Sequence, residues 1–153
     1  MMNIRRGVMI ILTIVVIIVI TGCNQDPFQY AFLHERDMIE KVEIFSFNDY
    51  DRTMELIITL SEDQIDALLN DLSSLECRSE SFLVQPNNYY GDVIICITYQ
   101  NDEKEIFGSY NIACISSTGE WRRTRDYFDV HEFRELLLKY VDVDVLAPIS
   151  EQF

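Results

Sequence analysis

Residues 93–100 read VIICITYQ, a nearly uninterrupted apolar stretch. A strand that is apolar at consecutive positions is buried on both faces, which is typical of the centre of a sheet. Polar residues follow at 101–103 and predict a turn into a further strand over 104–116. If residues 101–103 form the loop of this hairpin, Thr98 lies opposite Ile106.

Four other stretches have the composition or the period of a strand. Residues 40–47 and 54–60 are rich in β-branched and apolar side chains that recur at alternate positions, and the polar segment 48–52 joins them. This pattern predicts a hairpin. Further strands are predicted at 76–84 and at 121–125, the second of which leads directly to Tyr127-Phe128.

Two segments have helical periodicity. The first begins at Ser61, where Ser61-Glu62-Asp63-Gln64 matches a capping box. The second begins after Asp129, a typical N-cap residue. In both segments apolar residues recur every three or four positions, which predicts one buried stripe on each helix. These stripes consist of Ile65, Leu68, Leu69 and Leu72 in the first helix and Phe133, Leu136, Leu137 and Tyr140 in the second.

The predicted order of elements is β-β-α-β-β-β-β-α. Two amphipathic helices must bury their apolar stripes, and an antiparallel sheet supplies the surface. We therefore predict an α+β fold, with an antiparallel sheet of about six strands and two amphipathic helices packed on one face. Residues 40–147 form a single domain in this prediction, the valines at 141–145 a short extended segment, and residues 148–153 a tail.

The first 22 residues have the order of a secretory signal peptide. Arg5 and Arg6 precede the apolar run Val8–Ile20, which small residues end. Ile20-Thr21-Gly22-Cys23 resembles the lipobox of bacterial lipoproteins, an aliphatic residue and two small ones before a cysteine. The body resembles, in general pattern only, small lipoproteins of Gram-positive bacteria that have no assigned activity.

The resemblance to lipoproteins implies cleavage between Gly22 and Cys23 and a diacylglycerol on the Cys23 sulfur. Two acyl chains are enough for stable anchoring. We therefore expect a protein attached to the extracytoplasmic face of the cell membrane, with residues 23–39 as a lipidated tether. Phe28 and Tyr30 within this tether are apolar enough to dock onto the body. The alternative is an uncleaved N-terminal membrane helix.

The net charge is −14, and the residues after Cys23 account for −16 because the leader contains only two charges, both positive. A body this acidic argues against nucleic-acid binding, which requires Lys and Arg to neutralise phosphates. The cysteines left after Cys23 are Cys77, Cys96 and Cys114. Three is an odd number, and we expect no disulfide, with Cys77–Cys114 the first pair to check.

The residues give little sign of catalysis. His34 lies in the predicted tether and His131 at the start of a helix, and we expect both to be exposed. The best carboxylate clusters, 48–51 and 101–103, do not match a calcium loop and have the composition of ordinary turns. The glycines of the body are isolated, so no phosphate-binding loop is expected. We predict no cofactor, no metal site and no enzymatic activity.

One segment stands out as a binding surface. On a strand, Trp121, Arg123 and Arg125 share one face, where they can stack on or pair with a planar or anionic group. Tyr99, Tyr110 or the loop residues Tyr89 and Tyr90 would extend this face. In the alternative interpretation, the arginines pair with surplus carboxylates and Trp121 caps the core.

These features favour a non-catalytic binding module that contacts an envelope protein or a cell-wall component. Two alternatives stay open. One is a small envelope hydrolase that uses carboxylates or a bound cation, which requires a cleft with converging Asp or Glu. The other is an acidic inhibitor or immunity-type protein that neutralises a cationic secreted enzyme, with electrostatic attraction speeding its capture.

Overall fold

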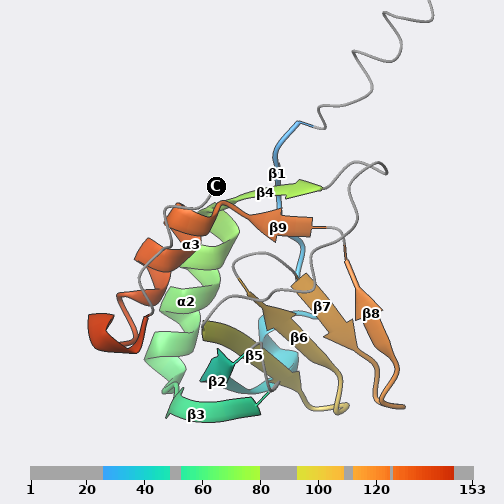
Figure 1. The fold of residues 1–153 in the computed structure, drawn as a ribbon. Helices are drawn as coiled ribbons and strands as arrows, with labels where there is room; N and C mark the ends of the chain where they lie inside the picture. Colours follow the sequence, from blue (N-terminus) through green and yellow to red (C-terminus); the bar gives the residue numbers. More distant parts are fainter. Residues whose placement is uncertain (1–25, 49–52, 80–92, 109–111, 125, 147–153) are drawn as a thin grey trace, which may run out of the picture.

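The computed structural model describes residues 26–48, 53–79, 93–108, 112–124 and 126–146. Its largest element is an antiparallel sheet in the strand order β3-β2-β5-β6-β7-β8 (Figure 1). The predicted central strand is confirmed, because every residue of β5 is buried and β5 pairs with β2 and β6. The strands are β2 (Ile39–Asn48), β3 (Thr53–Thr59), β5 (Val93–Tyr99), β6 (Lys104–Phe107), β7 (Ile112–Ile115) and β8 (Trp121–Arg123).

The turn after β5 begins one residue earlier than the sequence predicts. The Tyr99 N–H donates to the Glu103 carbonyl oxygen at 2.9 Å, and the loop consists of the three residues between them. Asp102 in this loop adopts a left-handed φ of 64°, which Asp tolerates better than most residues. Thr98 consequently pairs with Lys104, and the predicted register is wrong.

Residues 104–116, predicted as one strand, form the two antiparallel strands β6 and β7. Gly108, Ser109 and Asn111 lie between these strands in the sequence and are turn-forming residue types. The predicted turn between β7 and β8 is confirmed. In it Gly119 adopts a φ of 81°, a conformation that glycine reaches without strain.

A second antiparallel sheet, in the order β1-β4-β9, contains the strand that was predicted as third in the main sheet. Its strands are β1 (Phe28–Gln29), β4 (Glu76–Ser79) and β9 (Asp126–Phe128). Cys77 pairs with Phe128, and both side chains are buried, which holds this small sheet against the core. Residues 80–84, the remainder of the predicted strand, lie outside the described residues.

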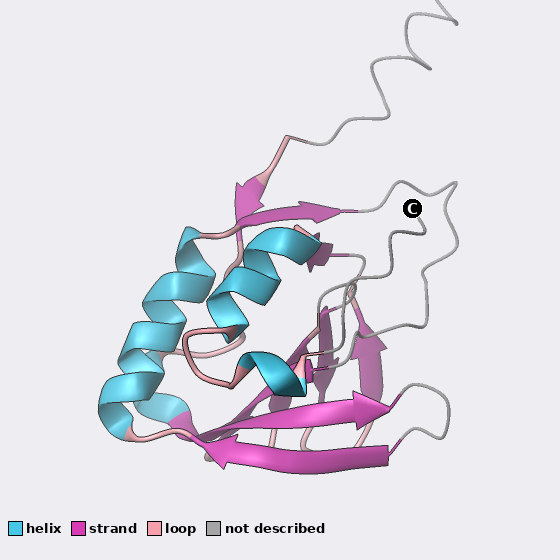
Figure 2. Ribbon diagram, turned by 60° about the vertical axis from the view of Figure 1, so that its left-hand side comes forward, coloured by secondary structure: helices cyan, strands magenta, loops and turns pink. Residues whose placement is uncertain are grey.

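The helices α2 (Glu62–Ser74) and α3 (Val130–Leu137) lie together on one side of the six-stranded sheet (Figure 2). Both predicted caps are confirmed. The Ser61 N–H donates to Gln64 Oε1 at 3.0 Å, and Asp129 Oδ1 accepts from the His131 N–H at 2.9 Å. Each cap satisfies amide groups that a helix N-terminus otherwise leaves free.

The two helical stripes meet the inner face of the sheet, which we define as the face that the helices cover, in one buried apolar cluster. The predicted α+β fold with two helices on an antiparallel sheet is therefore confirmed. After α3 the chain forms a short 3-10 helix (Val143–Val145) in place of the predicted extended segment, and Val141 and Leu146 on either side of it are buried. The inner cluster includes Leu68, Leu72, Phe133, Leu136 and Leu137 from the helices and Ile44, Ile95, Ile97 and Phe107 from the strands.

The predicted tether lies against the body over the part that the structure describes. We call residues 28–38, which end in a 3-10 helix (Arg36–Met38), the strap. Figure 1 shows β1 of the strap beside β4. The ring centroids of Tyr30 and Phe32 lie 5.3 and 6.0 Å from that of Phe107, so the strap packs onto the inner cluster. The docking expected from the apolar residues of this segment is thus observed.

Candidate binding face

The six-stranded sheet is apolar on both sides, and the side away from the helices buries a cluster of its own. We call this second side the outer face. Residues paired directly across antiparallel strands point to the same side of a sheet, so the register identifies its members. The apolar outer face consists of Met54, Leu56, Phe45, Phe47, Ile94, Cys96, Ile106, Ala113, Ile115 and Trp121.

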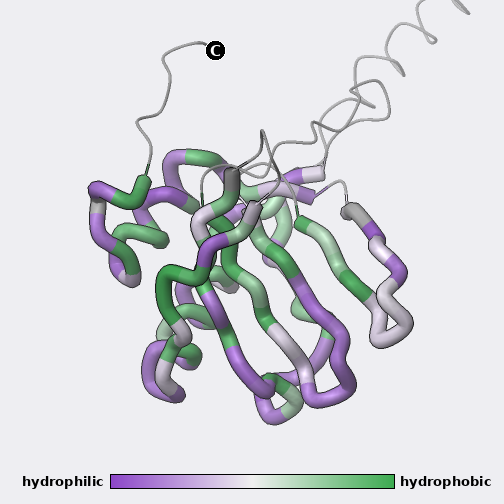
Figure 3. The backbone as a smooth tube through the Cα atoms, turned by 60° about the horizontal axis from the view of Figure 1, so that its bottom comes forward, coloured by the Kyte–Doolittle hydropathy of each residue, from purple (hydrophilic) through white to green (hydrophobic). Residues whose placement is uncertain are grey.

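The outer face is buried at its centre and exposed at both edges. Met54 and Leu56 on the edge strand β3 are 46% and 50% exposed, and Trp121 on the opposite edge strand β8 is 57% exposed. Figure 3 shows hydrophobic segments running along the strands of this sheet. An apolar strip with exposed aliphatic and aromatic ends has the composition of an interface centre.

The helices do not take part in the outer face. Every described member of its cluster, buried or partly buried, lies on a strand, whereas the helix side chains and the strap residues Tyr30 and Phe32 belong to the inner cluster. The sheet therefore separates a face covered by helices and strap from a face that no described helix covers.

The structure describes the predicted binding residues only in part. Trp121 is exposed on the outer face, as the binding interpretation requires. Arg123 pairs with Ala113, so its backbone position lies on the same face, but its side chain is not among those described. Arg125, Tyr89, Tyr90 and Tyr110 also lie outside the described residues.

Tyr99, which was predicted on the binding face, lies on the other side of the sheet, and several residues of the outer face were not predicted as binding residues. Tyr99 is fully buried on the inner face and takes no part in the outer face. The missed residues are apolar ones on β2 and β3, whose alternation in the sequence contains the signal. These residues join the strip only through the pairing register of all six strands. The sequence of a single strand does not reveal this register.

Glu105 on the inner face is a buried carboxylate with three hydrogen-bond donors. Its side chain is almost completely inaccessible, and Oε1 accepts from the Tyr30 hydroxyl at 2.8 Å and from the Leu33 N–H at 2.9 Å. Oε2 accepts from the Tyr99 hydroxyl. Burial raises the pKa of Glu105, and the hydrogen bonds from the two tyrosines oppose this shift. Two of the three donors belong to the strap, so Glu105 holds the strap on the sheet.

A second contact holds the strap at the surface. His34 hydrogen-bonds to Glu103, and Asn101 donates to the same carboxylate oxygen at 3.0 Å. The hydrogen bond from His34 lowers the pKa of Glu103. The His34 ring also packs edge-on against Tyr99, so the predicted exposure of His34 is wrong, whereas His131 is exposed as predicted.

The cysteines and the acidic turns show no reactive arrangement among the described residues. Cys77, Cys96 and Cys114 are free thiols. Burial raises the pKa of Cys77 to about 12 and raises the pKa values of the other two, which keeps all three protonated and poorly nucleophilic. No three His, Cys, Asp or Glu residues of the described part gather as metal ligands. Two acids of the first predicted turn, Asp49 and Asp51, lie outside that part.

Comparison with known proteins finds no matching family model, no similar curated protein and no similar solved structure. None of the described helices is long and apolar enough to cross a bilayer.

Proposed function

We propose that this protein is a lipoprotein held at the extracytoplasmic face of the cell membrane by lipid on Cys23, and that it acts as a non-catalytic binding module. Its binding surface is the outer face, and its partner is a protein of the cell envelope. The signal peptide and lipobox pattern of residues 1–23 support the anchor.

The observation that carries the binding role is the apolar strip that ends in Met54, Leu56 and Trp121. Met54 and Leu56 at one edge of the sheet and Trp121 at the other are large apolar side chains that solvent reaches, while the centre of the strip between them is buried. Trp is also enriched among the residues that dominate binding energy. A protein partner fits these exposed side chains better than a hydrophilic wall polymer, because all three are apolar.

The described carboxylates support a binding role more than a catalytic one. Glu105 is the described carboxyl group whose pKa is raised, a property typical of catalytic acids. It is enclosed beneath the strap, and Tyr30, Leu33 and Tyr99 already donate to its oxygens. These contacts give Glu105 a structural role at the base of the strap.

The test is crosslinking in intact cells, with the full chain carrying a C-terminal tag. A Trp121→Ala/Leu56→Asn variant alters both exposed ends of the outer face and leaves Met54 in place. Leu138→Asn is the matched control, because Leu138 is 42% exposed but follows α3, away from the sheet. We expect a stoichiometric protein partner that the double variant loses and the Leu138→Asn variant keeps.

Equal recovery of the partner by both variants would show that the outer face is not the binding surface. Recovery of wall polymer alone, or of no partner, would overturn the proposed protein interaction. A partner that is a cationic secreted enzyme, and that loses activity when bound, would identify the module as an inhibitor.

A further inference from the structure

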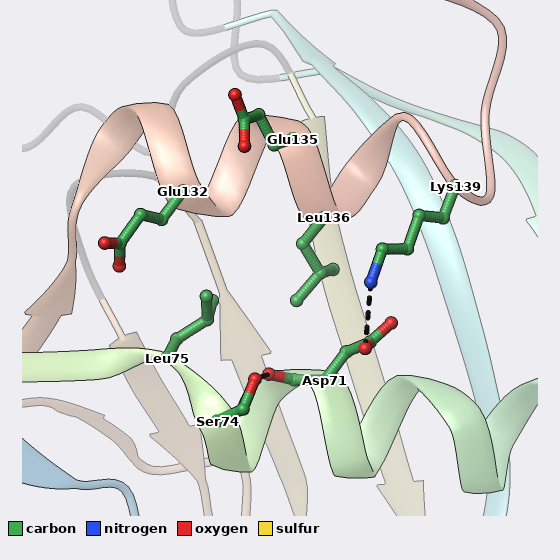
Figure 4. Close-up of a pocket in the computed structure, with 7 residues that line it drawn as sticks. All are labelled: Asp71, Ser74, Leu75, Glu132, Glu135, Leu136 and Lys139. Atoms are coloured by element: carbon green, nitrogen blue, oxygen red, sulfur yellow. Dashed lines mark hydrogen bonds and ion pairs between the residues drawn. The ribbon is translucent and has the colours of Figure 1, made fainter.

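A groove runs between the C-terminal half of α2 and α3, with a volume of about 300 Å³ (Figure 4). The apolar lining residues are Leu75, which is half-buried, and Leu136, which is 3% exposed and belongs to the inner cluster, and their side chains point toward each other from the two sides. A second hollow of about 320 Å³ shares Ser74 and Leu75 with it and continues to Phe28. The two hollows adjoin at these residues, at the C-terminal end of α2, and we call them together the channel.

The rim of this channel is negatively charged. Lys139 is the one cation among the lining residues of the two hollows, and its Nζ lies 2.9 Å from Asp71 Oδ1. This contact neutralises Lys139. Glu132 and Glu135 line the same groove and form no ion pair with a described residue. The apolar lining residues are thus flanked by carboxylates without counter-charges.

The end of α2 adds to the negative potential. A helix C-terminus carries a partial negative charge and favours cations, but the last turn of α2 contains no basic residue. The Ser74 hydroxyl donates to the Asp71 carbonyl oxygen, and the Ser73 hydroxyl donates to that of Leu69. These bonds satisfy two carbonyl groups but supply no positive charge.

We propose that the channel binds a basic amphipathic segment of another protein. Apolar side chains of this segment pack on Leu75 and on Phe28, which is 39% exposed, and its Lys or Arg side chains lie beside Glu132 and Glu135. The charge of −16 on the residues after Cys23 attracts such a segment and repels a second copy of the chain. The channel is separate from the outer face, and its occupant goes beyond the proposed function.

The test uses the full chain in nanodiscs of uncharged lipid, with empty nanodiscs as the blank. The probe is a synthetic helical peptide with leucines on one face and lysines on the other, and its binding is measured by titration calorimetry. A peptide with glutamates in place of the lysines is the probe control. We expect saturable binding of the lysine peptide and none of the glutamate peptide.

Three variants test the place of binding. Glu132→Gln/Glu135→Gln should weaken binding about fivefold, the effect of removing two exposed ion pairs. Glu40→Gln/Glu120→Gln makes the same change in net charge at exposed sites outside the channel and should leave binding unchanged. Ser74→Arg places a bulky cation in the channel and should reduce binding at least tenfold. The helix tolerates it, because a cation in the last turn is favourable.

Equal weakening by the two double variants would mean that overall charge is sufficient, and would overturn the assignment to the channel. Absence of saturable binding up to millimolar peptide would overturn it as well. Calcium that binds alone, displaces the peptide and depends on Glu132 and Glu135 would make the channel a cation site and would also overturn the proposal.

Discussion

At the scale of single residues, Glu105 is the buried charged side chain among those that the structure describes. A buried carboxylate without partners is costly, and three donors make this one acceptable. Because burial outweighs these donors, the pKa of Glu105 is raised. The folded state therefore holds the proton of Glu105 more tightly than the unfolded state does, which makes stability depend on pH.

We predict that wild type loses stability relative to Glu105→Gln as the pH rises. A raised folded pKa contributes stability that is fully present below the unfolded pKa, about 4.3, and is lost as the pH rises through the folded value. Urea unfolding of both proteins from pH 4 to pH 8 measures the difference. The other titratable groups near Glu105 are the same in both proteins. They are Glu103, whose pKa is lowered, and the neighbouring Tyr30, Tyr99, Cys114 and His34.

A difference that instead grows in favour of wild type with rising pH would contradict this prediction. It would mean that the hydrogen bonds from Tyr30, Tyr99 and Leu33 outweigh burial and lower the pKa of Glu105.

The sequence does not reveal the position of Glu105, and the reason lies in how its partners are arranged. Glu105 comes two residues after a turn, where a charged residue is ordinarily exposed. Tyr30 lies 75 residues away from it, and no local pattern relates the two. By contrast, the caps Ser61 and Asp129 were predicted correctly, because a cap acts on amides within three residues of itself.

At the scale of elements, the sequence pattern predicted the strand and helices that depend on neighbouring residues alone. The apolar run of β5 predicted a central strand because burial on both faces requires it. The two hairpins around β6 were predicted less well, since one turn residue, Asp102, shifts the register and the break after Phe107 has no hydrophobic signal. The outer face depends on this register, so the sequence predicted Trp121 but not the strip that leads to it.

The final helix α3 provides a stability test of the packed element. Leu137 is 2% exposed in the inner cluster, and Leu138 beside it is 42% exposed. Leu137→Ala should lower the free energy of unfolding by about 2–5 kcal/mol, because it leaves a cavity between helix and sheet. Leu138→Ala should change it by less than about 0.5 kcal/mol. Denaturant unfolding measures both, and similar costs at the two positions would contradict the packing of α3.

At the scale of the whole molecule, the proposed anchor and the two binding surfaces occupy different parts of the chain. The strap leads from the proposed lipid site to the main sheet, the outer face lies across that sheet, and the channel lies between the helices. This separation allows each surface to be altered without touching the others.

We predict that Cys23→Ala leaves an unprocessed chain that retains residues 1–22 and carries no lipid. Lipid attachment requires the Cys23 thiol, and cleavage before this residue depends on the modification that the lipobox resemblance implies. Intact mass measurement of the chain purified from membranes tests this. Cys114→Ala is the control, and we expect it to be processed normally. A mature chain of normal length from the Cys23→Ala variant would sink the lipoprotein proposal.

The docking of the strap has a consequence for how far the domain can travel. With lipid on Cys23, only four residues lie between the anchor and Phe28, and the five Cα-to-Cα steps span at most about 17 Å. A free segment up to Ile39 would have sixteen such steps and a reach of about 55 Å. The volume that the domain can search is then smaller by roughly thirtyfold, and its local concentration near the bilayer is higher by the same factor. Partners that lie close to the membrane meet the domain often, and those deeper in the wall are out of its range.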